Sequence, residues 1–201
     1  LIRDADGVVG GDGLLPTIKS IAFASWEAQR GQLKYVQPED PDEDEFFVPR
    51  VIAPLPLARL GRERLDRVFP ARGDGESQDI GLFLGLHLVR NGSVALFCGQ
   101  KASVTKLCRR AVDIFARRVE LEPPVASADG VQVAKLARLI GLHLGENAVS
   151  TEAARLGFFG HHANTPHGVK LAVEHAMKEG HANFVICTST LAQGVNFPLR
   201  Y

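Results

Sequence analysis

The second half of the chain alternates short apolar runs with longer segments in which apolar residues recur every three or four positions. The continuous apolar runs at 93–98 and 184–187 predict strands that are buried on both faces, as in a parallel sheet. A third, shorter strand is expected at 157–159. The helical spacing predicts a helix that begins at Ser77 and stops at Gly92, and further helices over 103–119, 131–144, 151–156 and 167–178. This order of elements predicts an α/β fold, with a parallel sheet covered by helices.

The first third of the chain has a much weaker pattern. Residues 1–16 are rich in Gly and Asp and are typical of a flexible lead-in. Residues 32–36 have a weak strand pattern, and the acidic, proline-broken run at 38–45 predicts a solvated loop. The prolines within 46–57 exclude a central strand there and favour an edge strand or extended coil.

These patterns predict three parts. We expect an interdomain lead-in over 1–25, an irregular, β-containing segment over 26–76, and the α/β domain over 77–201. The chain begins with Leu1 and stops three residues after Pro198, so we expect it to be a fragment of a larger protein.

Each of the three predicted strands is followed by a polar turn. Right-handed crossovers place the carboxyl ends of parallel strands at one edge of the sheet, and ligands bind outside those ends. We therefore expect the three turns to form one surface. The candidate residues are Gly99, Gln100 and Lys101 in the first turn, His161, His162 and Asn164 in the second, and Thr188, Ser189 and Thr190 in the third.

The third turn opens a longer run, T-S-T-L-A-Q-G-V-N-F-P at 188–198. This run resembles motif V of the superfamily 2 DEAD/DEAH-box helicases, in the form found in the superkiller-type subgroup. The sequence F-G-H-H-A-N at 159–164 resembles the His-His loop of the same subgroup, and the strand, turn and helix that begin at 93 resemble motif IV. The resemblance covers roughly 93–201 and implies the second RecA-like domain, a partial parallel sheet with helices on both faces.

The resemblance also implies roles for individual residues. Thr188 and its neighbours would donate to phosphate oxygens, and the other two turns would approach the nucleic-acid backbone. Gly194 and Asn196, at the end of the motif, would help to line the nucleotide site. The residues themselves leave two alternatives open. The hydroxyls after the strand can cap the backbone, and His161 can hold its loop in place through hydrogen bonds.

The activity implied by the resemblance is that of an ATP-dependent nucleic-acid helicase or translocase, with ATP and Mg²⁺ as cofactors of the full-length protein. Its partners would be single-stranded or partly duplex nucleic acid and the first RecA-like domain. No phosphate loop of the form G-x-x-x-x-G-K-[ST] occurs in the 201 residues, so we expect this fragment to be inactive alone, with no catalytic residue of its own. The alternative is a non-catalytic RecA-like module that binds nucleic acid or a protein.

Charge and composition narrow these expectations. The chain carries 23 basic and 23 acidic side chains, so a nucleic-acid role must depend on local sites. The three cysteines lack metal-ligand spacing and predict buried thiols in a reducing, intracellular compartment such as the cytoplasm. His161, His162 and His167 lack a carboxylate or Cys at useful spacing, which disfavours a metal site. No apolar stretch reaches roughly 18 residues, so no membrane-spanning segment is expected.

Overall fold

The computed structural model describes residues 2–3, 32–37, 40–48, 52–71, 76–189 and 198–201. The chain divides into two compact units: Leu1–Leu55 with Pro70–Gly81, and Pro56–Phe69 with Leu82–Tyr201. The second unit, the α/β unit, thus includes residues 56–69, which the sequence pattern assigned to the irregular segment.

The first unit contains a three-stranded antiparallel sheet in the order β1-β2-β3. Its strands are β1 (Ile2–Arg3), β2 (Gln32–Gln37) and β3 (Asp40–Val48). The strand predicted at 32–36 is confirmed. The loop predicted at 38–45 is wrong, because all of that run from Asp40 onward belongs to β3. An outer strand that pairs on one side only can tolerate acidic residues and a proline, which explains why the composition misled the prediction.

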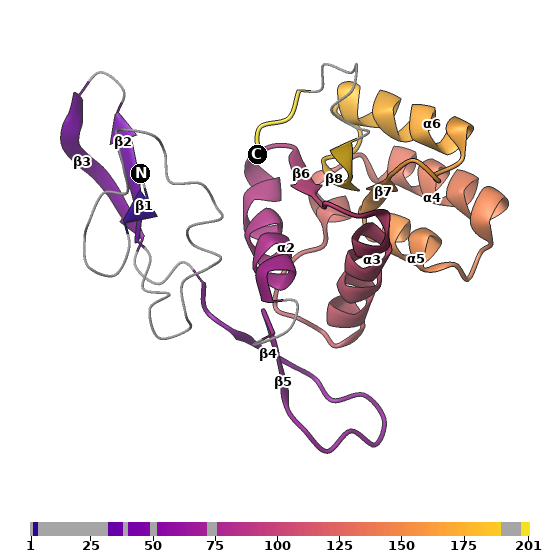
Figure 1. The fold of residues 1–201 in the computed structure, drawn as a ribbon, viewed down its shortest axis with the longest axis horizontal. Helices are drawn as coiled ribbons and strands as arrows, with labels where there is room; N and C mark the ends of the chain where they lie inside the picture. The colour runs from indigo at the N-terminus through magenta and orange to yellow at the C-terminus, as the bar shows by residue number, and fades with distance from the viewer. Residues whose placement is uncertain (1, 4–31, 38–39, 49–51, 72–75, 190–197) are drawn as a thin grey trace. The chain divides into compact units, whose positions relative to one another are not determined.

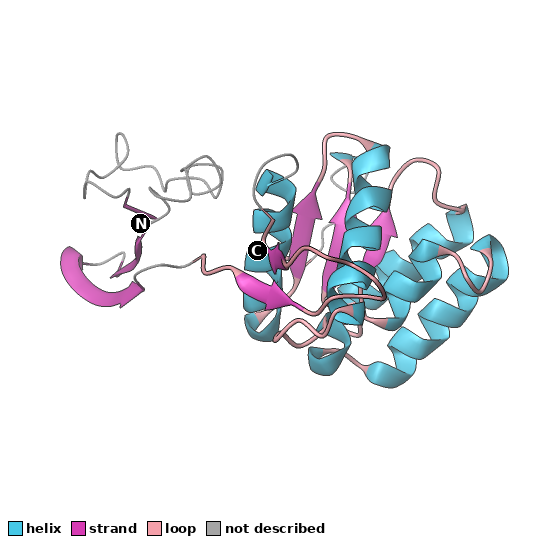
Figure 2. Cartoon of the chain, turned by 90° about the horizontal axis from the view of Figure 1, so that it is seen from below, coloured by secondary structure: helices cyan, strands magenta, loops and turns pink. Residues whose placement is uncertain are grey.

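The α/β unit is built on a parallel sheet in the order β6-β8-β7 (Figure 2). The strands are β6 (Val94–Phe97), β7 (Phe159–His161) and β8 (Phe184–Cys187). The predicted α/β class and parallel sheet are confirmed. The middle strand, β8, is buried along its whole length, as its continuous apolar run predicts.

One strand lies two residues later than its sequence pattern predicts. Residues 157–158 belong to the turn that follows the preceding helix rather than to β7. Gly157 has φ +91°, in the left-handed region that ends helices, and the Phe158 amide donates to the Ala153 carbonyl at 3.0 Å. The apolar pair Phe158-Phe159 gave no signal that could separate a helix end from a strand start.

All the predicted helices are present, with ends that differ by up to four residues. In α4 the Asp129 carboxylate caps the first turn, because it accepts hydrogen bonds from the amides of Val131 and Gln132 at 3.1 Å each. The helices are α2 (Glu76–Leu88), α3 (Lys101–Ala116), α4 (Gly130–Leu144), α5 (Val149–Arg155) and α6 (His167–Lys178).

Helices cover both faces of the parallel sheet (Figure 2). On one face Phe184 packs edge-on against Phe158, with 5.0 Å between the ring centroids. Gly85 lets α2 approach this face so closely that a Cβ at that position would lie 2.8 Å from the Phe184 ring. On the other face Val185 belongs to a core cluster with apolar residues of α4 and α6, such as Val133 and Val173. The sheet is therefore the middle layer of three.

Two further segments pack onto the α/β unit. Strands β4 (Leu55–Leu57) and β5 (Arg67–Phe69) pair with each other, and β5 was not expected from the sequence. At the other end of the chain, the Tyr201 amide donates to the Ser93 carbonyl at 3.1 Å, and the Ala95 amide donates to the Tyr201 carbonyl at 2.9 Å. This bonding pattern is that of a parallel pair, so Tyr201 lies beside the start of β6.

Candidate nucleic-acid interface

The turns that follow β6, β7 and β8 meet at one edge of the sheet. Phe97 and His161 are both register partners of Cys187, so the three strands end level. The bonding continues past the strands, with the Cys98 amide on the Cys187 carbonyl at 2.7 Å and the Thr188 amide on the His161 carbonyl at 3.1 Å. We name this edge the rim and define it by Gly99, Gln100, Lys101, His162, Asn164, Thr188 and Ser189.

The first two turns also touch through their side chains. The Lys101 ammonium donates to the Asn164 carbonyl oxygen at 3.4 Å, although the two residues are 63 positions apart. Lys101 and Asn164 are both exposed, so this bond lies at the surface of the rim. A long contact of this kind leaves the ammonium able to bind an anion instead.

His161 lies behind the rim rather than on it. Its side chain is only 2% exposed, and its Nε2 lies 2.7 Å from Oε1 of Glu174 on α6. Its Nδ1 is buried and has no hydrogen-bond partner among the described residues. This geometry favours the alternative role for His161, in which the ring fixes the loop to α6.

On the rim, hydrogen bonds with Thr165 and Asn164 hold the His162 turn. The His162 amide donates to the Thr165 hydroxyl at 3.2 Å, the Thr165 amide returns a bond to the His162 carbonyl at 3.0 Å, and the Asn164 amide donates to His162 Nδ1 at 3.2 Å. Burial, followed by the nearby charges of His161, Lys101 and Lys170, lowers the pKa of His162 below 6.5. The ring is therefore neutral at pH 7, and because Nδ1 accepts a bond, its proton is on Nε2.

Two helices begin at the rim. At the N-cap positions of α3 and α6, Gln100 and Pro166 make no side-chain capping bond, so no cap side chain occupies the first amide donors of either helix. A helix N-terminus carries a partial positive charge and favours anions. The sequence adds to this effect, because 98–112 and 157–173 contain five Lys or Arg residues and no Asp or Glu. A chain of zero net charge thus has a locally basic edge.

The remaining candidates differ in exposure. Gly99 is exposed, and a Cβ added there would meet no atom within 4 Å, so its backbone is open to a ligand. Thr188 is 9% exposed, whereas Ser189 is exposed. Three predicted residues, Thr190, Gly194 and Asn196, lie outside the described part of the chain.

Hollows lined by described residues lie at opposite edges of the sheet of the α/β unit. One, of about 210 Å³, adjoins the rim between α3, α4 and the His162 turn, with apolar walls that include Val104 and Ile140. The other, of about 440 Å³, lies near the starts of β6 and β8 and is lined in part by Asn183 and Met177. The larger hollow is therefore not the one beside the predicted site.

The cysteines and histidines show no second site. All three cysteines are free and buried, as predicted, and burial raises the pKa of Cys98 and Cys187 to about 11 and that of Cys108 to about 12. Within the described ranges, no group of three or more His, Cys, Asp or Glu residues is placed to hold a metal ion. No helix in those ranges is both long enough and apolar enough to cross a membrane.

The sequence interpretation missed two groups of cations. Lys170 lies in the first turns of α6 and acts on His162, yet a lone lysine four residues after Pro166 gave no signal of its own. Arg59, Arg62 and Arg64 lie between β4 and β5, where the spacing of arginines in R-L-G-R-E-R-L-D-R was a visible but unused signal.

Neither a comparison with protein-family models nor one with curated proteins found a match for this chain. The resemblance to superfamily 2 helicases therefore depends on the motifs of the sequence alone.

Proposed function

We propose that this chain is the second RecA-like domain of a superkiller-type superfamily 2 helicase, and that its rim binds the sugar–phosphate backbone of single-stranded or partly duplex nucleic acid. The observation that supports this proposal best is the level ending of β6, β8 and β7, which brings three sequence-distant polar turns to one edge.

The chemistry of the rim suits phosphates better than bases. Its donors are a lysine ammonium, a neutral imidazole N–H, hydroxyls and the first amides of two helices. Groups of this kind bind the sugar–phosphate backbone of a nucleic acid whatever its base sequence is. The defined rim residues include no Phe, Tyr or Trp, and the His162 imidazole is their one ring on which a base could stack.

The side chains at and behind the rim have different roles in this proposal. Thr188 and Ser189 donate to a phosphate oxygen beside the end of β8, and Lys101 neutralises the charge of a neighbouring phosphate. His162 donates from Nε2, in an orientation that Thr165 and the Asn164 amide hold. His161 is a positioning residue, because its bond to Glu174 fixes the loop from behind.

In the full-length protein, ATP with Mg²⁺ would close this domain against the first RecA-like domain and so move the bound strand. Gly194 and Asn196 would form part of the nucleotide site. Because the 201 residues contain no phosphate loop, the chain alone should not hydrolyse ATP. The same absence supports the second candidate, a non-catalytic module that binds nucleic acid or a protein.

The rim is tested by binding a fluorescent single strand and following its anisotropy at several salt concentrations. We expect salt-dependent binding, and we expect Lys101→Ala to weaken it and to make the slope of log K against log salt shallower by about 0.7. Gly99→Ala should weaken binding without lowering stability, since its Cβ meets nothing in the protein. The exposed Lys135→Ala on α4 is the matched control. Rim variants that bind as tightly as this control would contradict the proposal.

The enzymatic part is tested separately by measuring phosphate release from ATP with Mg²⁺, with and without the strand. We expect no release above background from this chain. Strand-stimulated hydrolysis by the purified chain would contradict the assignment to a second RecA-like domain. Adding the parent's first RecA-like domain should restore hydrolysis to a helicase fragment, whereas a non-catalytic module would stay inactive.

A further inference from the structure

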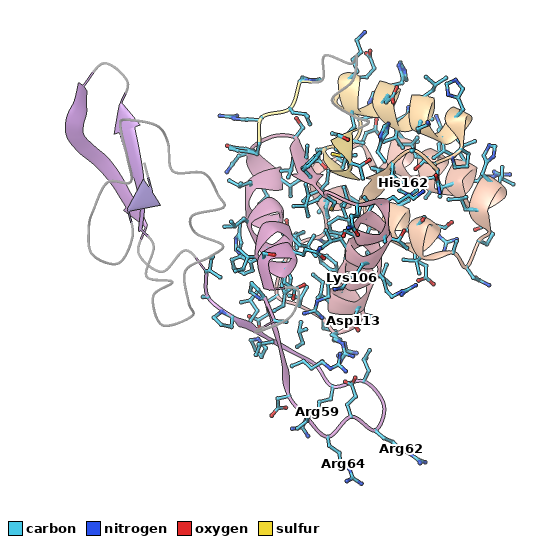
Figure 3. All side chains as sticks on the ribbon, in the orientation of Figure 1. Arg59, Arg62, Arg64, Lys106, Asp113 and His162 are labelled. Carbon is cyan, nitrogen blue, oxygen red and sulfur yellow. The ribbon has the colours of Figure 1, made fainter. Side chains whose placement is uncertain are left out.

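The loop of residues 58–66, between β4 and β5, projects from the α/β unit (Figure 1). We name it the arginine loop. Figure 3 shows Arg59, Arg62 and Arg64 on it, with their side chains directed outward. Leu65, next to Arg64, is 79% exposed.

An ion cluster around the buried Arg117 side chain holds the base of this loop. The Arg117 side chain is 4% exposed and binds both carboxylate oxygens of Glu63, at 2.6 and 2.8 Å. Its Nε binds Asp113 at 2.7 Å, and its Nη1 donates to the Ala58 carbonyl at 3.2 Å. The backbone adds a further bond, because the Ala58 amide donates to the Arg117 carbonyl at 3.0 Å. A projecting loop is thereby fixed to the end of α3.

The ion pairs also decide which charges are left over. The carboxylates of the loop and of α3 are those of Glu63, Asp66 and Asp113, and each is paired. Asp66 pairs with Arg59 at 2.7 Å, and Glu63 also pairs with Arg67 at 3.1 Å. Arg62 and Arg64 are exposed, and neither has an ion-pair or hydrogen-bond partner among the described residues. The outer part of the loop therefore carries two uncompensated guanidinium groups.

The arginine loop and the rim lie at opposite ends of α3. The helix begins at the rim with Lys101 and ends beside Arg117, and its 16 residues span about 24 Å. Lys106 and Arg109 are exposed between the two ends. In Figure 3, Lys106 lies between His162 and Asp113, and the labelled arginines of the loop lie beyond Asp113. Exposed cations thus continue from the rim to the loop.

We propose that the arginine loop is a second backbone-binding site, which takes phosphates of the nucleic-acid strand after it leaves the rim along α3. This inference rests on the proposed function of the rim. Arg62 and Arg64 bind the phosphates, since a planar guanidinium can donate two parallel hydrogen bonds to one phosphate. The loop is preorganised by the Arg117 cluster, so little ordering accompanies binding.

The experiment measures how tightly strands of two lengths bind the wild-type chain and a double variant that carries both Arg62→Ala and Arg64→Ala. At a rise of about 3.4 Å per nucleotide, a span of about 24 Å corresponds to roughly seven nucleotides. A strand of about 15 nucleotides should bind the double variant about tenfold more weakly at low salt, with a salt slope shallower by about 1.4. A strand of about three nucleotides should bind both proteins alike, because it cannot reach from the rim to the loop.

Two controls make the result specific. A double variant that carries Lys135→Ala and Arg138→Ala removes the same charge from exposed positions of α4. Its affinity for the long strand should stay within about twofold of the wild-type affinity. The pair Arg62→Lys with Arg64→Lys keeps the charge and should restore the salt slope, with weaker binding than wild type. Because neither loop arginine has an ion-pair or hydrogen-bond partner within the described ranges, the variant with both alanines should unfold at the wild-type temperature.

The outcomes separate this inference from the function on which it rests. If no strand binds the wild-type chain, the proposed function fails. If the strand binds and Lys101→Ala weakens it while the loop variants have no effect, the inference alone is overturned. An equal loss from the α4 control would also overturn it. So would loop variants that lose binding only to an acidic peptide such as polyglutamate, which would assign the loop to a protein partner.

Discussion

The rim and the arginine loop are both basic, but they are built in opposite ways. Backbone bonds of a buried parallel sheet hold the rim, and its charges are few. Side-chain ion pairs around Arg117 hold the loop at the far end of α3. The comparison teaches that a basic surface can be positioned by sheet register or by charge. A surface positioned by charge should respond far more strongly to pH and to a single substitution.

The largest expected effect comes from Arg117→Met, which keeps most of the side-chain volume and removes the cation. Glu63 and Asp113 would lose a partner that is 4% exposed, and we expect the free energy of unfolding to fall by about 2–3 kcal/mol. Urea denaturation gives the change. Amide hydrogen exchange should speed up in the arginine loop and stay slow in β6, β7 and β8.

The matched control for this prediction is Arg138→Met, at an exposed position of α4. A surface substitution of this kind should change stability by no more than about 0.5 kcal/mol. Equal destabilisation by the two variants would show that the Arg117 cluster does not anchor the loop. Faster exchange in the sheet as well would show that the rim depends on the same cluster.

A smaller effect is expected from acid. The hydrogen bond from Arg117 lowers the pKa of Glu63 from 4.5 to about 2. A carboxyl with a lowered pKa in the folded state stabilises the protein fully above pH 4.5, and the stabilisation is lost as the pH falls toward 2. The difference in unfolding free energy between wild type and Glu63→Gln should therefore be constant above pH 4.5 and shrink below it. A difference that stays unchanged down to pH 2 would contradict the pairing, and exposed Glu179→Gln serves as the reference.

The smallest effect concerns the rim. Burial lowers the pKa of His162, so its imidazole should titrate below pH 6.5 in an NMR experiment, with the signal assigned through His162→Gln. Protonation of His162 is less favourable in the folded state than in the unfolded state. The free energy of unfolding should therefore decrease as the pH falls below 6.5. Bound phosphate should raise the midpoint, since it favours the imidazolium. A midpoint that a saturating strand does not move would exclude His162 from the interface.

Prediction from sequence worked where one pattern sufficed. The continuous apolar run of β8 and the periodic spacing of α3, α4 and α6 gave their element types correctly. It failed where a tertiary partner overrode local composition. The acidic run became part of β3 because β2 satisfies its backbone, and the start of β7 moved because Gly157 places 157–158 in the turn that ends α5. The arginine loop escaped notice because its anchor, Arg117, lies 54 residues from Glu63.

The sequence by itself determined the layered α/β class and the polar turns after each strand, because both follow from continuous apolar runs, their ends and the 3.6-residue period within short windows. Only the tertiary structure decided that His161 turns inward to Glu174, and that Arg62 and Arg64 are the charges left unpaired. Those outcomes depend on which distant groups come within a few ångströms of each other. Burial and pairing of polar groups are set by the whole packed chain, and no local pattern encodes them.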